Sequence, residues 1–411
     1  MTITNEVKWR PKLALFLISQ AVSMTGSMVV AYAVMWYLTI ETSSGAVMTG
    51  IVLCNCLPQI CISPFAGVWA DRYSRKRIVI LADCFIALST LILALVWLSG
   101  YKELWFVFLV MIVRSLGGGV QAPAVNALIP ALTPFDQLTR VNAIYSTVNN
   151  VLALLAPALG GVLLALGLAP ALFFDVATAL LAVVIFSFIR VSPLVRSAAT
   201  AGNSVLADFK AGMSYISANP WLRFLLIFYA VIFFLIAPAS YLTPLMVERE
   251  FGPEIWRLTA NEIIWSAGAA LGGVVVAAWG GFRNRIFSIG FACLMFGLTF
   301  ALMGGAQNFW FYLAVMGVSG LFLPLFVTAE TTLLQEKTEE QMLGRVSSVM
   351  NIVVAGAMPL AMLIMGPLAD MIDVRWIIGG SGLAMALCGA VMLMNKAWQA
   401  FDDRKITSQE K

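Results

Sequence analysis

Histidine is absent from this 411-residue chain, and charged residues make up only 11% of it. Histidine is the commonest general base and a frequent zinc ligand, so its absence argues against histidine-based catalysis and metal binding. No lysine directly follows a glycine, which excludes the phosphate-binding sequence G-x-x-x-x-G-K of ATP-driven proteins. No pairing of a nucleophile with a base is visible either. We therefore expect neither an enzyme nor a resident cofactor or metal.

Cysteine is scarce as well. The six cysteines all lie in apolar runs: Cys54, Cys56, Cys61, Cys84, Cys293 and Cys388. In such surroundings they act as small packing residues, so we expect no disulfide or metal framework. The polar first ten residues lead into the first apolar run without a small-residue cleavage site. The sequence therefore predicts a retained first helix and no signal peptide.

Apolar residues, in contrast, make up 61% of the chain, and the mean hydropathy is +0.92. Soluble domains contain about 45–50% apolar residues, so the composition indicates a polytopic membrane protein. A helix needs about 20 apolar residues to cross a bilayer core, and these runs are too long and unbroken for the strands of a transmembrane barrel. They predict twelve helical spans, at residues 12–38, 46–69, 78–99, 104–129, 141–166, 170–190, 221–246, 259–281, 286–304, 308–333, 345–369 and 376–395.

Lysine and arginine are distributed unevenly over the loops between these spans. If the N-terminus is inside, twenty of the 25 cations lie in inside segments, Arg114 lies within a span, and four lie outside: Lys102, Arg249, Arg257 and Arg375. The positive-inside rule then predicts that both termini are cytoplasmic. The net charge of +4 is a topology signal and does not indicate nucleic-acid binding.

The longest polar segment separates two predicted six-helix bundles, residues 1–190 and residues 221–411, the latter with a short cytoplasmic tail. In the linker, residues 191–220, Asn203 and Ser204 can cap a helix. Its apolar side chains share one face: Val205, Leu206, Phe209, Met213 and Ile216. The sequence predicts an amphipathic helix on the cytoplasmic interface; a disordered linker is the alternative.

The two halves also resemble each other. Arg140 precedes Gly161 by 21 residues, and Arg345 precedes Gly366 by the same offset, 205 residues further along the chain. This spacing suggests a duplication. Two parallel six-helix halves are the arrangement of major facilitator transporters, whose halves move about a central site.

The densest charge in the chain follows the second predicted span. Six residues there fit the loop signature G-x-x-x-D-R-x-x-R-K-x of the major facilitator superfamily: Gly67, Asp71, Arg72, Arg75, Lys76 and Arg77. The resemblance implies a cytoplasmic latch that holds the outward-facing state, with Gly67 allowing close helix packing. A plain topology anchor is the alternative, but it would not require Gly67 or Asp71. The second half has a weaker counterpart at residues 280–285, with two arginines and no carboxylate.

Arg114 lies in the middle of the fourth predicted span, where a cation is costly unless it is paired or faces water. It resembles the span-four arginine of the superfamily, which is thought to influence proton exchange on a nearby carboxylate. A structural ion pair between two helices is the alternative. Gln121, Pro123 and Asn126 follow on the same span, so we expect this helix to face the interior.

The fifth predicted span contains a proline among small residues. It is close to the antiporter signature G-P-x-x-G-G, with Ala156 in place of the first glycine and matches at Pro157, Gly160 and Gly161. Such a helix bends and packs tightly, which suits a gate. The resemblance favours export by antiport over uptake by symport, and ordinary small-residue packing is the alternative.

Four carboxylates lie within the apolar spans: Asp83, Asp175, Glu262 and Glu330. Carboxylates withdrawn from water can bind and release protons near neutral pH, as a proton-driven carrier requires. Asp83 and Glu330 are expected near the cytoplasmic ends, within reach of residues 72–77 and of Lys337, where salt bridges are the alternative. Asp175 and Glu262 are expected toward the outer ends without a local cation, so we rank them first as proton carriers. A water-exposed position at the outer mouth is the alternative for both.

A set of aromatic and sparingly polar side chains is predicted to line a substrate cavity. Its members are Tyr32, Trp36, Gln121, Asn126, Tyr145, Asn149, Asn150, Tyr229 and Phe233. Packing or lipid contact is the alternative for each of them.

Over nearly its full length the chain resembles the proton-driven drug exporters of the major facilitator superfamily, in particular the macrolide-efflux-like branch. The resemblance rests on residues 20–23, 82–83, 114–115, 122–127, Asp175, Glu262 and residues 335–346, together with the loop signature. It implies export of bulky amphipathic compounds, such as macrolide-like antibiotics, by proton antiport with alternating access. It also implies a multi-pass protein of the bacterial cytoplasmic (inner) membrane. The expected partners are a drug-like substrate, protons and membrane lipids, with no nucleic acid and a monomeric carrier. An exporter of a siderophore or other natural product, and a non-transporting scaffold or receptor, are the alternatives.

Overall fold

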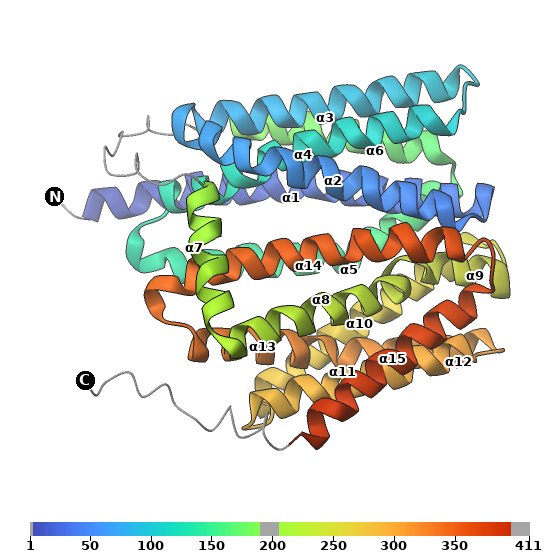
Figure 1. Ribbon diagram of the computed structural model, residues 1–411. Helices are drawn as coiled ribbons and strands as arrows, with labels where there is room; N and C mark the ends of the chain where they lie inside the picture. Colours follow the sequence, from blue (N-terminus) through green and yellow to red (C-terminus); the bar gives the residue numbers. More distant parts are fainter. Residues whose placement is uncertain (1–2, 190–204, 396–411) are drawn as a thin grey trace, which may run out of the picture. The chain divides into compact units, whose positions relative to one another are not determined.

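The structure is a computed structural model that describes residues 3–189 and 205–395, without the side chains of residues 3–8, 71 and 205–208. Every regular element in these residues is helical. Twelve helical spans are long and apolar enough to cross a membrane (Figure 1), which confirms the all-α prediction and the number of spans. The predicted cap residues Asn203 and Ser204 and the tail after residue 395 lie outside the described residues.

The contacts divide the chain into two compact units. Unit 1 is Met1–Glu41 with Gly50–Ala198, and unit 2 is Thr42–Thr49 with Ala199–Lys411. The helices of unit 1 are α1 (Ile3–Thr42), α2 (Gly45–Arg72), α3 (Arg75–Leu98), α4 (Leu104–Leu132), the 3-10 helix η1 (Phe135–Gln137), α5 (Leu138–Ala165) and α6 (Leu168–Ser187). The last residue of α1 and the first turn of α2 therefore belong to unit 2 by their contacts.

The helices of unit 2 include two spans that are each interrupted. The helices of unit 2 are α7 (Val205–Ala218), α8 (Pro220–Tyr241), α9 (Thr243–Phe251), α10 (Ile255–Trp279), α11 (Arg285–Gly304), α12 (Phe309–Leu321), α13 (Leu323–Lys337), α14 (Glu340–Leu368) and α15 (Val374–Met394). The spans Pro220–Phe251 and Phe309–Lys337 each consist of two helices. Pro244 and Pro324 lie in the first turns of α9 and α13, where a proline starts a new helix because it cannot donate the backbone hydrogen bond that would continue the old one.

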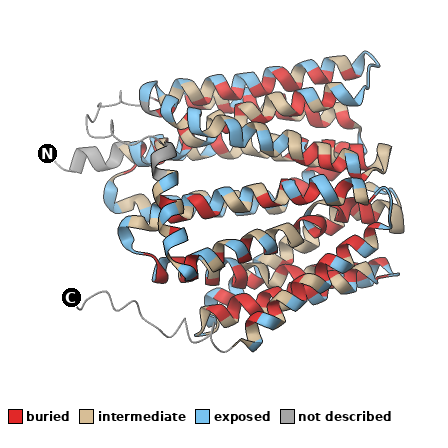
Figure 2. Cartoon of the chain, in the orientation of Figure 1, coloured by how far each residue is buried: buried red, intermediate tan, exposed pale blue. Residues whose placement is uncertain are grey.

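Helix α3 shows how each span is divided into a lipid face and an interior face. Large apolar side chains recur at steps of three and four residues, which is one side of a helix: Leu81, Phe85, Leu88, Ile92 and Leu95, each 45% to 68% exposed. A stripe of this kind is unfavourable in water and suits contact with acyl chains. The opposite face buries Asp83, Ile86 and Thr90, so α3 carries polar groups into the interior of unit 1. Figure 2 shows buried and exposed residues alternating along the helices.

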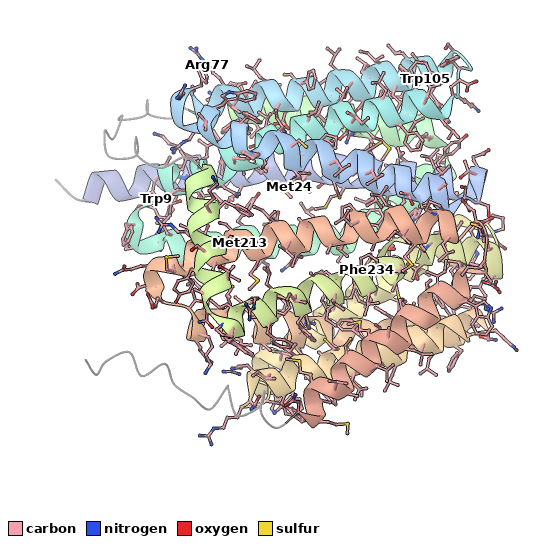
Figure 3. The ribbon with its side chains drawn as sticks, viewed as in Figure 1. Trp9, Met24, Arg77, Trp105, Met213 and Phe234 are labelled. Atoms are coloured by element: carbon pink, nitrogen blue, oxygen red, sulfur yellow. The ribbon has the colours of Figure 1, made fainter. Side chains whose placement is uncertain are left out.

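Tryptophans mark one end of several spans. Trp105 begins α4, Trp310 begins α12 and Trp376 begins α15, and they are 57%, 68% and 77% exposed. Figure 3 shows Trp105 at one end of unit 1, with Trp9 and Arg77 toward the opposite end. Exposed tryptophans at span ends are typical of the interface between membrane and water.

The predicted amphipathic linker helix is present as α7, and it packs against other helices of unit 2. Ile216 is 1% exposed, and α7 packs against α14 and α8 within unit 2 (Figure 1). A Cβ added at Gly212 would lie 2.8 Å from the backbone oxygen of Arg345, so the two helix backbones touch there. The helix is therefore docked on unit 2, and its position on the membrane interface stays a prediction.

Asp370, just beyond the end of α14, holds the turn between α1 and α2. Its carboxylate accepts hydrogen bonds from the backbone N–H groups of Gly45 at 2.6 Å and Ala46 at 2.9 Å, and from the Ser44 hydroxyl at 2.9 Å. Arg249 adds an ion pair at 3.0 Å. A carboxylate is a favourable cap for a helix N-terminus because it meets unpaired N–H groups and the positive end of the helix dipole. Asp370 thus anchors the first turn of α2 to unit 2.

We expect an Asp370→Asn variant to unfold at a temperature a few degrees lower at pH 7, because hydrogen bonds to a charged group contribute about 1.5–3 kcal/mol. Burial raises the pKa of Asp370, but its hydrogen bonds outweigh burial and hold the pKa below the usual value. A lowered pKa means that the stabilisation is complete above the unfolded-state pKa of about 3.9 and is lost as the pH falls through the folded-state pKa. In detergent, the unfolding temperature of the variant should therefore lie below that of the wild type by a constant amount between about pH 5 and 7. The difference should shrink in stronger acid.

Glu103→Gln is a matched control, because Glu103 is exposed and makes no side-chain hydrogen bond at the start of α4. A deficit of equal size in the control would show that the loss does not come from the cap.

Candidate functional site

The interior of unit 1 holds a buried ion pair between Arg114 of α4 and Asp175 of α6. The Arg114 guanidinium contacts the Oδ2 atom of Asp175, whose side chain is 0% exposed. The Thr90 hydroxyl donates to the same oxygen at 3.0 Å and also contacts the guanidinium, and the Ser27 hydroxyl lies 3.4 Å from Oδ1. Four helices, α1, α3, α4 and α6, therefore converge on one carboxylate.

A glycine lets α1 reach this pair. A Cβ added at Gly26 would lie 2.0 Å from the Thr178 hydroxyl and 2.9 Å from both the Cα and the Oδ1 atoms of Asp175. No side chain fits at that distance, so only glycine allows α1 and α6 to approach so closely. The approach brings Ser27 next to Asp175.

Asp83 forms a second polar cluster, one that contains no cation. Asp83 is 3% exposed; its Oδ1 atom accepts from the Ser23 hydroxyl at 2.7 Å and from the Gln121 side-chain amide at 2.8 Å. Ser23 and Ser27 are one helical turn apart and so lie on the same face of α1. On that face Ser23 contacts Asp83, and Ser27, one turn further along α1, contacts Asp175. The two carboxylates interact electrostatically.

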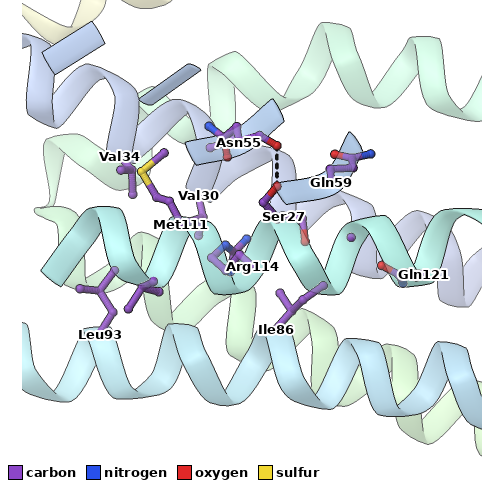
Figure 4. A pocket seen from close by; sticks show the side chains of 14 residues that line it. Ser27, Val30, Val34, Asn55, Gln59, Ile86, Leu93, Met111, Arg114 and Gln121 are labelled. Carbon is purple, nitrogen blue, oxygen red and sulfur yellow. Dashed lines mark hydrogen bonds between the residues drawn. The ribbon is translucent and has the colours of Figure 1, made fainter. Parts of the chain in front are cut away.

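A chamber of about 230 Å³ adjoins these clusters. Its polar lining consists of Ser27, Asn55, Gln59, Arg114, Ser115 and Gln121 (Figure 4), and Arg114 is the only charged residue among the described residues that line it. The Ser115 hydroxyl donates to the backbone oxygen of Asn55 at 2.5 Å. This volume accommodates several water molecules but falls below the about 300–1,000 Å³ typical of sites for drug-sized ligands. The Arg114 chamber suits water and protons; a bulky compound needs more room.

Unit 2 contains a smaller chamber at Glu262. Its volume is about 100 Å³, and its lining includes Ser240, Thr243, Glu262, Trp265 and Met316. The Asn261 side-chain amide donates to Glu262 at 3.2 Å and in turn accepts from the Tyr312 hydroxyl at 2.8 Å. No ion pair reaches Glu262 from the described residues, so neutral donors alone hold this carboxylate.

Glu330 of α13 makes no hydrogen bond or ion pair within the described part of the chain, and none joins it to Lys337. It interacts electrostatically with Tyr229 and Cys293. Tyr229 is fully buried, and its hydroxyl has no partner among the described residues. Seven residues of helix put Glu330 and Lys337 about 10 Å apart along the axis, which explains why the salt bridge considered as the alternative does not form between them.

Two predicted positions need correction. Asp175 was expected without a local cation, but Arg114 forms an ion pair with it. The two residues are 61 positions apart in the sequence and come together because α4 and α6 face each other here. Asp83 was expected within reach of the cations at residues 72–77, but neutral Ser23 and Gln121 bind it instead. Asp83 lies six residues below Arg77, about 9 Å along the helix.

The charged loop between α2 and α3 binds carbonyl groups within unit 1. Arg75 donates to the backbone oxygens of Ala70 at 3.2 Å and Ala127 at 2.9 Å. Lys76 donates to the oxygens of Ser187 at 2.8 Å and Ile189 at 2.7 Å, at the end of α6. These contacts tie the loop to α4 and α6.

Two members of the predicted latch behave differently. The side chain of Asp71 lies outside the described residues. A Cβ added at Gly67 would meet no atom within 4 Å, so the expected close helix packing at Gly67 is not found here. In the second half, the carboxylate that residues 280–285 lack comes from α13, where Glu336 lies 3.8 Å from Arg285. The latch itself stays a prediction.

The proline-containing motif of α5 packs toward α1. Ala156, Pro157, Gly160 and Gly161 are all buried, and a Cβ added at Gly160 would lie 3.2 Å from the Cβ of Tyr32. The motif thus forms a tight helix contact inside unit 1, and its gating role stays a prediction.

The predicted cavity residues are dispersed. Gln121 lines the Arg114 chamber, whereas Trp36 and Tyr229 are 0% exposed and offer no surface to a ligand here. Of the others, Tyr32, Tyr145, Asn149 and Phe233 are half-buried, and Asn126 and Asn150 are exposed. The sequence reasoning missed Ser23, Ser27, Thr90, Asn55, Gln59 and Asn261. The sequence did offer a signal for four of them. Ser23 and Ser27, and likewise Asn55 and Gln59, are polar residues four positions apart within apolar spans, so each pair lies on one helix face.

Twelve membrane spans with buried charges and water-sized chambers between the helices define a multi-pass membrane transport protein. The chain belongs to the major facilitator superfamily, whose family model matches residues 16–362. This is a family of transporters, and the relatives described below are named as efflux or transport proteins. The chain is accordingly a multi-pass protein of a bacterial membrane.

Individual relatives support this placement. The chain is 28% identical to macrolide efflux protein A of Streptococcus pyogenes over 394 residues, which cover 94% of this chain and 97% of the relative. It is 28% identical to macrolide efflux protein A of Enterococcus faecalis over 322 residues, 77% of this chain and 99% of the relative. A crystal structure of a mutant of the nucleoside transporter NupG matches 95% of this chain and 99% of that protein with a TM-score of 0.73 at 14% identity, a likeness that concerns the fold alone.

Proposed function

We propose that this protein exports bulky amphipathic compounds in exchange for protons by alternating access, and that macrolide-like antibiotics are the first class to test. The relatives named for macrolide efflux match it over most of both chains. The observation that carries the proton part of the proposal is the Arg114–Asp175 ion pair beside a water-sized chamber. Its two partners lie on different helices, so a change in its charge acts on how those helices pack.

Proton binding at Asp175 changes the balance of charge in unit 1. In the deprotonated state Arg114 and Asp175 compensate each other, which a low-dielectric interior requires. A proton on Asp175 removes the negative charge and leaves Arg114 without its partner, so the guanidinium moves toward the polar wall of the Arg114 chamber, where Asn55 and Gln59 can accept from it. Proton binding is thereby coupled to the packing of α4 against α6.

Asp83 and Glu262 are further proton sites in this proposal. Each is held by neutral donors alone, so a proton can join or leave without breaking an ion pair. Asp83 and Asp175 contact the same face of α1, through Ser23 and Ser27. A proton therefore has a short route between the two carboxylates through water in the chamber. Glu262 lies in unit 2 and gives that unit a titratable group of its own. Glu330 is the least supported carrier, because no donor orients it.

The energetics allow such an exchange. One charge that crosses a membrane potential of about 150 mV releases roughly 3.5 kcal/mol, which sustains a concentration gradient of about a few hundredfold per proton. The proposal places both termini in the cytoplasm, because that orientation puts twenty of 25 cations inside. We also propose that the carrier works as a monomer.

Export of an anionic natural product is the second candidate, and the chamber does not favour it. An anionic substrate would require several cations, but Arg114 is the one cation among the described residues that line the Arg114 chamber, and it is already paired with Asp175. A non-transporting scaffold is the third candidate. It predicts that replacing Arg114 or Asp71 leaves every transport measurement unchanged.

The test is a drug-susceptibility panel in a bacterium that lacks its main exporters, followed by accumulation measurements with and without a protonophore. We expect the protein to lower the accumulation of at least one macrolide, and the protonophore to abolish that effect. Accumulation that is the same with and without the protein, across the whole panel, would contradict export. An effect that survives the protonophore would contradict proton coupling.

A further inference from the structure

A groove at the beginnings of α1 and α5 lies apart from both chambers and has no assigned role. Its volume is about 360 Å³, and the residues that line it all belong to unit 1. Arg10 comes from α1 and Arg140 from α5. Figure 3 shows Trp9 close to the start of α1, at the end of unit 1 opposite Trp105.

The groove has positive charge that no described residue compensates by an ion pair. Arg10 and Arg140 are exposed, and neither forms an ion pair with any residue in the described ranges. The Arg10 guanidinium lies 5.8 Å from the ring centroid of Trp9, close enough for a cation–π contact. Asp136 is nearby in sequence, but its carboxylate accepts from the Gln137 amide at 2.9 Å and is not part of the lining. Among the described residues, the groove thus presents two guanidinium groups without an ion-pair partner.

Apolar surface begins one turn below each arginine. On α1, Leu13 and Leu17 follow Arg10 at three and seven residues; on α5, Ile144 follows Arg140 at four, so each set shares one helix face. At 1.5 Å per residue, Leu17 lies about 10 Å and Ile144 about 6 Å deeper in the span than the arginine of the same helix. Ile144 is 43% exposed. The groove is therefore positive at its mouth and apolar along its depth.

We propose that this groove binds one anionic phospholipid. Its phosphate lies between the guanidinium groups of Arg10 and Arg140, and an acyl chain lies along Leu17 and Ile144. Arginine forks bind phosphate oxygens in pairs, and basic pockets between membrane helices bind anionic headgroups. A soluble anion would leave the apolar wall uncovered, and a zwitterionic lipid would leave the charge uncompensated. Phe135, in the turn just before Gln137, is 92% exposed, as an aromatic residue at a lipid interface can be.

Native mass spectrometry of the full-length protein in detergent tests the proposal, with phosphatidylglycerol and phosphatidylcholine as probes. We expect the wild type to bind phosphatidylglycerol in preference, and the double variant Arg10→Gln/Arg140→Gln to bind it about thirtyfold more weakly, since two cations near the surface are removed. Arg223→Gln/Arg283→Gln is the matched control, because both residues are exposed and have no ion pair in the described chain. The control should keep wild-type binding.

Three outcomes would overturn the proposal: equal affinity of the wild type and the Gln double variant, equal loss in the control, or competition by free glycerol phosphate as effective as that by the intact lipid. The last would indicate a soluble-anion site. If the Gln double variant does not fold, Arg10→Lys/Arg140→Lys keeps both charges and removes the forks, and we expect weaker but salt-sensitive binding. None of these measurements depends on what the protein exports, so they stand if the proposed function fails.

Discussion

An Asp175→Asn variant is expected to lose proton-coupled export while it still reaches the membrane. Asparagine keeps the shape of the side chain, and its single amide oxygen can accept from one of the two hydroxyls, Thr90 or Ser27. It can neither carry the charge nor bind the proton. A gradient of up to about a few hundredfold per proton should therefore collapse to about one. Drug accumulation in energised cells measures this directly, with Asp136→Asn, an exposed carboxylate on η1, as the matched control.

The loss of Asp175 also leaves the Arg114 guanidinium, only 13% exposed, without its partner. Removing one member of a buried ion pair costs about 3–5 kcal/mol, so the single variant should be less stable as well. Adding Arg114→Gln removes the orphaned charge and should restore the melting temperature without restoring coupled export. If the double variant regained export together with stability, the ion pair would be a structural connection between α4 and α6 and not a proton site.

The fold was accessible from the sequence because membrane spans follow from hydropathy windows and loop charge alone. The predicted span at residues 221–246 corresponds to Pro220–Phe251, and the one at residues 345–369 to Glu340–Leu368. The breaks at Pro244 and Pro324 were missed, since a hydropathy window does not register one residue that lacks an N–H group. The docking of α7 was missed because amphipathicity predicts a covered face without saying whether lipid or protein covers it.

The sequence was enough to predict which residues belong to the candidate site, but not which of them contact one another. Arg114 and Asp175 each stand out as charges in apolar runs, and the cost of such charges requires partners. Which partner each one takes depends on helix rotation and on Gly26, which allows α1 to approach Asp175. A sequence shows that Ser27 is polar; only packing shows that it faces Asp175.

A Glu262→Gln variant is expected to retain drug binding and to lose most of the dependence of export on pH. Glutamine preserves the hydrogen bond from Asn261 and the volume of the Glu262 chamber, so the fold of unit 2 should be unaffected. No ion pair is broken either, in contrast to Asp175, and the melting temperature should stay within about a degree of the wild type, as for a substitution that costs under about 0.5 kcal/mol. Export in inverted or right-side-out vesicles, measured from pH 6 to 8 where perturbed carboxylates titrate, gives the readout.

The comparison with Asn261→Ala separates proton binding from positioning. That substitution leaves the Glu262 carboxylate able to bind a proton but removes the donor that orients it, together with the link to the Tyr312 hydroxyl. We expect export by Asn261→Ala to keep a pH dependence that is shifted along the pH axis, whereas Glu262→Gln flattens it. A Glu262→Gln variant with the wild-type pH profile would show that Glu262 takes no part in proton exchange, and would leave Asp175 and Asp83 of unit 1 as the proposed proton sites.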